Sequence, residues 1–142
     1  MGFSIEQRER DGVRILALHG QLVLGDPVET LRDTLLALLA GAVEGGQNAV
    51  VLDCRETSYI DSSGLGTLVM AHARAVKVHG RMPIYGLSRR GLELMVITKL
   101  STVFEIYDNE IDAINSCFPD RKSNHFDILD FVRRQKSEAP EA

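Results

Sequence analysis

Apolar positions along the chain change from alternating runs to helical spacing and back several times. Residues 13–18 are an apolar, β-compatible run that follows a weaker stretch at residues 3–8, with Asp11 and Gly12 as a turn between them. This pattern predicts a hairpin at the start of the chain. Apolar residues at helical spacing then occupy residues 26–42 and predict an amphipathic helix.

The rest of the chain repeats strand and helix patterns in alternation. In order, we expect a buried strand at 49–52, a helix at 65–76, a strand at 82–85, a helix at 88–100, a strand at 103–107 and a helix at 110–118. Pro83 cannot donate to a strand ladder and favours an edge position or an irregular conformation for its strand. Strands that alternate with helices pair in parallel, so the order ββαβαβαβα predicts an α/β fold with a mixed, mostly parallel sheet and helices packed on it.

A further helix is expected near the C-terminus. Residues 119–124 are polar and turn-rich, residues 125–135 carry apolar positions at helical spacing, and residues 136–142 resemble a frayed tail. The chain therefore divides into one domain, residues 1–118, and an extension, residues 119–142. Three roles stay open for this helix: packing on the domain, contact with a second copy in a homodimer, or contact with a partner. Its short polar connection favours packing on the domain.

Composition and charge restrict the partners. With 44% hydrophobic and 25% charged residues the chain has ordinary globular composition, and its net charge of −4 offers no basic field for nucleic acid. No apolar run approaches the roughly 20 residues that cross a bilayer, and no signal peptide is evident, so we expect a cytoplasmic protein that binds no membrane. The two cysteines and four histidines show no metal-ligand spacing, and neither a metal nor a cofactor is expected.

Candidate functional residues concentrate where the strands end. Parallel strands bring the loops after them to one edge of the sheet, here residues 24–26, 59–64 and 87–90. The middle loop carries two serines at the start of a helix, a position that favours an anion. We assign Ser63 as the helix cap and Ser62 as the exposed hydroxyl. We expect Gly64 and Gly66 to permit close backbone approach, either to a partner or to the neighbouring strand.

The segment Asp61-Ser62-Ser63-Gly64-Leu65-Gly66 resembles the signature of STAS-domain anti-sigma-factor antagonists. The resemblance extends over residues 3–118 and implies a phosphorylation-controlled binding switch without enzymatic activity. In that family an anti-sigma-factor serine kinase phosphorylates the first serine of the pair, here Ser62, and a serine phosphatase reverses the step. The unphosphorylated form binds the kinase, and a sigma factor is released. The chain departs from many close members at Gln21-Leu22-Val23, where they carry Glu-Leu-Asp.

These considerations define the candidate site and its alternatives. Ser62 is the expected phosphoacceptor, and the expected partner-binding residues are Asp61, Ser62, Ser63, Gly64, Leu24, Tyr59, Arg89 and Arg90. A scaffold subunit of a sensory or lipid-transport assembly is the main alternative, and it would use the same surface for packing. A serine hydrolase using Ser62 is a remote one, because the G-x-S-x-G elbow is missing and His72 falls on the apolar face of its helix.

Overall fold

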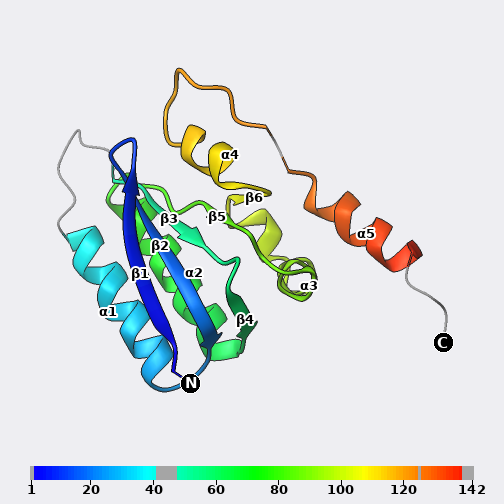
Figure 1. Cartoon of the computed structure of the whole chain (residues 1–142), viewed down its shortest axis with the longest axis horizontal. Helices are drawn as coiled ribbons and strands as arrows, with labels where there is room; N and C mark the ends of the chain where they lie inside the picture. Colours follow the sequence, from blue (N-terminus) through cyan, green and yellow to red (C-terminus); the bar gives the residue numbers. More distant parts are fainter. Residues whose placement is uncertain (1, 41–47, 125, 139–142) are drawn as a thin grey trace.

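The computed structural model describes residues 2–40, 48–124 and 126–138. Figure 1 follows the chain through these elements: β1 Ser4–Arg10, β2 Val13–Leu22, α1 Asp26–Ala40, β3 Val50–Asp53, β4 Thr57–Ile60, α2 Ser62–Lys77, β5 Ile84–Tyr85, α3 Arg89–Ile97, a 3-10 turn Leu100–Thr102, β6 Ile106–Tyr107, α4 Glu110–Asn115 and α5 Ile128–Glu138. Residues 41–42, His125 and residues 139–142, for which helix or tail structure was expected, lie outside the described residues.

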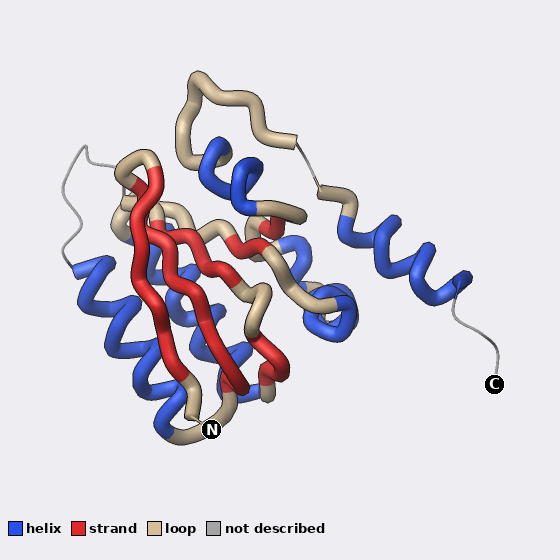
Figure 2. Tube along the Cα trace, viewed as in Figure 1, coloured by secondary structure: helices blue, strands red, loops and turns tan. Residues whose placement is uncertain are grey.

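The strands form one mixed sheet in the order β1-β2-β3-β5-β6, with β4 paired to the far end of β2 (Figure 2). β1 and β2 are antiparallel, and all other pairs are parallel. The hairpin turn has positive φ at both Asp11 (53°) and Gly12 (82°), which is the geometry of a tight turn matched to strand twist. The predicted α/β class, opening hairpin and mostly parallel sheet are confirmed.

Two apolar layers cover the two faces of the sheet. On one face, leucines of β2 pack against α1, α2 and α3, with Leu31, Leu35, Leu68 and Met95 fully buried. On the other face, α4 covers a smaller cluster that includes Ile15, Val51 and Ile114. β3 is buried at every position, as expected of a strand between two layers.

The C-terminal helix packs on the domain. Ile128 and Val132 of α5 are 9% and 5% exposed and belong to the larger apolar cluster. Phe126 and Phe131 pack against the same cluster and against each other, with ring centroids 5.7 Å apart. The expected intramolecular packing is thus confirmed, although α5 begins later than predicted and extends to Glu138 through part of the predicted tail.

Several predicted elements were wrong in detail. Tyr59 and Ile60, expected in the loop 59–64, belong to strand β4, and the strand expected at 103–107 is reduced to β6 behind a 3-10 turn. The helix expected at 110–118 ends at Asn115. The edge position expected from Pro83 was wrong, since β5 lies inside the sheet, but the irregular conformation agrees with a strand shortened to Ile84–Tyr85. Pro83 precedes the strand and needs only its carbonyl, which accepts from Leu52 N at 2.8 Å.

An ion-pair network joins β1, the end of β3 and the start of α4, next to the turn that leads into β4. Arg55 binds Asp53 with Nε and Nη2, at 3.0 and 2.8 Å, and Asp53 is only 4% exposed. Arg8 donates to Glu110 and to the Tyr85 hydroxyl, which itself donates to Glu110 at 2.8 Å. Burial alone would raise the pKa of Asp53, but the hydrogen bonds from Arg55 lower it to about 2. The hydrogen bond from Arg8 lowers the pKa of Glu110 to about 2, against the opposing effect of burial.

These lowered pKa values predict acid sensitivity. A carboxyl group whose pKa is lower in the folded chain stabilises the fold above its unfolded pKa, and this contribution is lost as the pH falls towards the folded value. The free energy of unfolding should therefore decrease steadily from about pH 5 to about pH 2. In Glu110→Gln, denaturant titrations should give lower stability at pH 7 and a shallower decrease below about pH 5. An equal decrease in both proteins would contradict a role for Glu110.

Candidate functional site

The loops after β2 and β4 meet at one edge of the sheet through Asp61. The Asp61 carboxylate accepts from Leu24 N at 3.0 Å with Oδ2 and from Gly64 N at 2.8 Å with Oδ1. Its own backbone N–H donates to the Leu22 carbonyl at 3.2 Å. Asp61 therefore ties the β2–α1 loop to the start of α2. The hydrogen bonds from Gly64 and Leu24 lower the pKa of Asp61, so it is charged at neutral pH and is a poor base.

Asp61, and not Ser63, caps α2. The Asp61 backbone is extended (φ −91°, ψ −177°), which places its carboxylate below the N–H of Gly64, three residues ahead. Ser63 is the second residue of the helix, where its hydroxyl cannot reach the free N–H groups of the first turn in this way. The assignment of Ser63 as the cap was therefore wrong.

Ser62 is the first residue of α2 and is exposed, whereas Ser63 is half-buried. Within the described part of the chain, the Ser62 hydroxyl forms no hydrogen bond. An anion on this oxygen would lie at the positive end of the α2 dipole. The site can thus accept a phosphate without losing a contact of the fold.

The two glycines of the segment differ in surroundings. A Cβ on Gly64 would lie 2.3 Å from the Leu22 carbonyl oxygen, so α2 can approach β2 this closely only with glycine. A Cβ on Gly66 would meet nothing within 4 Å, so Gly66 makes no close approach to the neighbouring strand, and a close approach to a partner stays a prediction for that residue. Gly64 therefore sets the position of the Ser62 helix against the sheet.

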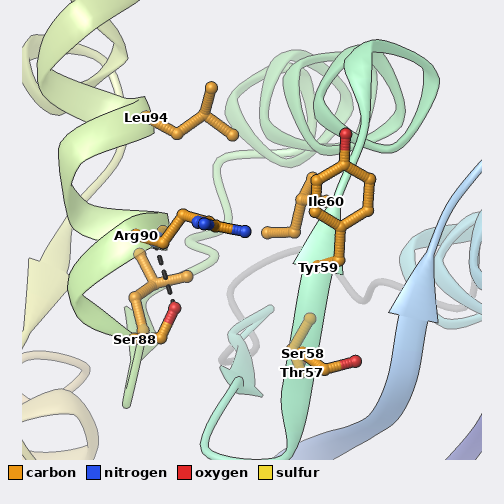
Figure 3. A pocket seen from close by; sticks show the side chains of 9 residues that line it. Thr57, Ser58, Tyr59, Ile60, Ser88, Arg90 and Leu94 are labelled. Carbon is orange, nitrogen blue, oxygen red and sulfur yellow. Dashed lines mark hydrogen bonds between the residues drawn. The ribbon is translucent and has the colours of Figure 1, made fainter.

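A groove lies beside this loop, between β4 and α3. We call it the β4–α3 groove; its volume is about 290 Å³, and it is lined by Thr57, Ser58, Tyr59, Ile60, Leu87, Ser88, Arg90, Gly91 and Leu94. Figure 3 shows the Arg90 side chain reaching from α3 towards β4. Ser88 caps α3 by accepting from Gly91 N at 3.1 Å. The sequence did not reveal this groove, because the short strand β4 was not recognised.

The remaining predicted residues surround the same edge. Leu24 and Tyr59 are exposed at 74% and 46%. Arg89 pairs with Glu93 one helical turn ahead, at 3.2 Å, while Arg90 lines the groove. The structure thus brings Asp61, Leu24 and the serines together and places Arg90 across the groove from β4.

The arrangement does not favour hydrolysis at Ser62. His72 follows ten positions later on α2, about 15 Å away along the helix axis, and its ring packs edge-on against Phe104 at 5.6 Å. Both oxygens of the Asp61 carboxylate already accept hydrogen bonds.

Across residues 2–40, 48–124 and 126–138, no three His, Cys, Asp or Glu side chains gather as metal ligands. No described helix is long and apolar enough to cross a membrane.

Comparison with known proteins agrees with this fold. The STAS domain model matches residues 4–113, and the chain belongs to the STAS domain family. An anti-sigma-B factor antagonist of Listeria monocytogenes is 39% identical over 111 residues, which cover 78% of this chain and 93% of that protein. An anti-sigma F factor antagonist of Paenibacillus polymyxa is 26% identical over 115 residues, or 80% of this chain and 94% of that protein.

A solved structure has the same fold. The crystal structure of an anti-sigma factor antagonist from Mycobacterium paratuberculosis gives a TM-score of 0.70 at 19% identity, over 82% of this chain and 94% of that one. At this identity the similarity establishes only that the fold is shared. The similarity to anti-sigma factor antagonists rests on the sequence relatives.

Proposed function

We propose that this protein is a cytoplasmic anti-sigma factor antagonist that is switched by phosphorylation of Ser62. Unphosphorylated, it binds an anti-sigma serine kinase and so frees a sigma factor; phosphorylated, it releases the kinase until a serine phosphatase restores the hydroxyl. The catalysis belongs to these partners, and the chain itself acts by binding, without direct contact to nucleic acid. The names of the sequence relatives support the role of antagonist.

The observation that carries the proposal is the environment of Ser62. Its hydroxyl is exposed at the first position of α2, beside a carboxylate that two backbone N–H groups hold in place. A kinase can reach this oxygen without unfolding the helix. The added phosphate brings about −1.5 to −2 charges to a surface that already carries Asp61. A partner that covers this surface would have to desolvate both charges.

Phosphosite mapping tests the assignment of the acceptor. After incubation with ATP and the anti-sigma kinase from the same genome, mass spectrometry should find one phosphate on the peptide that contains Ser62. Ser62→Ala should abolish this modification, whereas Ser63→Ala should retain it, since Ser63 is half-buried within the first helical turn. Modification of Ser63 in the Ser62→Ala protein, at the rate of the wild type, would contradict the assignment.

A further inference from the structure

The strand β4 has a free edge that faces the β4–α3 groove. β4 pairs in parallel with β2, and no other described strand pairs with it. Figure 3 shows β2 on one side of β4 and α3 on the other, so the groove follows the edge that no strand covers. The N–H of Thr57 is bound by the Cys54 carbonyl at 3.1 Å, which leaves residues 58–60 as the accessible part of this edge. A strand with one neighbour presents backbone donors and acceptors that another chain can pair with.

The groove has the size and lining of a site for a short peptide. Ile60 (8% exposed), Leu87 and Leu94 supply apolar walls, and the half-exposed Tyr59 stands at the rim. Its volume of about 290 Å³ is at the small end of ligand pockets, which begin at about 300 Å³. An extended segment with one apolar side chain fits this space better than a cofactor does.

Arg90 gives the groove its charge. It is the only charged side chain among the lining residues, and its guanidinium forms no ion pair or hydrogen bond with any described residue. Its neighbour Arg89 is bound to Glu93. A cation in the first turn opposes the helix dipole, so Arg90 does not stabilise α3. The complementary group is a carboxylate brought by the peptide.

We propose that the β4–α3 groove binds an extended acidic segment of a protein partner by strand addition to β4. Backbone hydrogen bonds to residues 58–60 align the segment, an apolar side chain enters between Ile60 and Leu94, and a carboxylate binds Arg90. The identity of the partner as the anti-sigma kinase rests on the proposed function, whereas the peptide site itself does not.

The test titrates the full chain with the peptide acetyl-Val-Leu-Val-Glu-Val-amide, followed by backbone amide NMR. Shift changes should be confined to residues 58–60 and 87–94. Arg90→Ala should weaken binding about tenfold or more, as expected for the loss of a charge-assisted hydrogen bond. Arg32→Ala, which removes one exposed cation from α1 and does not touch the groove, is the matched control and should bind as the wild type does. A peptide in which proline replaces the central valine lacks a backbone donor and should also bind more weakly.

Four results would overturn the proposal: shifts centred elsewhere, equal binding to Arg90→Ala, equal binding of the proline peptide, or no binding at millimolar peptide. Melting curves check that each variant is folded, and Arg90→Gln, which stays polar but loses the charge, serves if the alanine variant is not. Because no kinase is present, failure here leaves phosphorylation of Ser62 unaffected. If the peptide binds but the kinase does not phosphorylate Ser62, only the proposed switch is rejected and the peptide site stands.

Discussion

Ser62→Asp is expected to weaken binding of the anti-sigma kinase about a hundredfold, while Ser62→Ala binds as the unphosphorylated protein does. In the proposed function the kinase covers this surface, so the aspartate places a charge beside Asp61 that must be desolvated. This costs about 3 kcal/mol, which corresponds to a factor of about one hundred. Isothermal titration calorimetry of the purified pair measures both affinities.

The fold itself should tolerate this change. An acidic residue at the first position of α2 agrees with the helix dipole, so the melting temperature of Ser62→Asp should equal or exceed that of the wild type. Gln7→Glu adds one negative charge to an exposed position on β1, away from the loop, and should leave kinase binding intact. Equal binding of Ser62→Asp and Ser62→Ala would refute the switch.

Gly64→Ala and Gly66→Ala are expected to have opposite effects on stability. The alanine Cβ at position 64 would meet the Leu22 carbonyl oxygen and Cγ at 2.3 and 2.9 Å, so α2 must move away from β2. Overpacking of this kind typically lowers the free energy of unfolding by about 1–3 kcal/mol. At position 66 there is open space, and alanine is favoured over glycine within a helix by up to about 1 kcal/mol.

Urea denaturation of the two variants and the wild type measures the difference. The two substitutions add the same methyl group to the same helix, so helix propensity cancels and the contact with β2 remains as the cause. Equal midpoints for the two variants would contradict the close approach at Gly64. If the approach is as described, Gly64→Ala should also reduce kinase binding, because Ser62 moves together with the start of α2.

Periodicity was sufficient for the elements that bury long apolar stretches. The hairpin, β3, α1 and α2 each combine a strong pattern with a recognisable turn or helix start, such as Asp11-Gly12. The short elements were harder to predict. β4 has only four residues, with buried ends and an exposed centre, and a stretch of that length resembles a loop. The position of β5 also could not be read from Pro83, because the proline lies one residue before the strand.

The site was predictable as a location but not in its contacts. The rule that loops meet at the ends of parallel strands placed Leu24 near Asp61, and a hydrogen bond of 3.0 Å joins them. The sequence could not decide which of three consecutive polar residues caps α2, since Asp61, Ser62 and Ser63 all suit a helix start. Backbone conformation at Asp61 decides it. Likewise, Arg89 and Arg90 are equivalent in the sequence. In the structure Arg89 forms an ion pair with Glu93, whereas Arg90 lines the β4–α3 groove.

The hydrogen bonds of Asp61 to Leu24, Leu22 and Gly64 lower the entropy that the loop loses when a partner binds. Hydrogen bonds from two chain segments hold the loop in one conformation before any partner arrives. Little backbone freedom is then lost when the complex forms, so most of the contact energy appears as affinity. Such a preorganised surface is sensitive to a single added charge, because the loop cannot change its conformation to accommodate that charge.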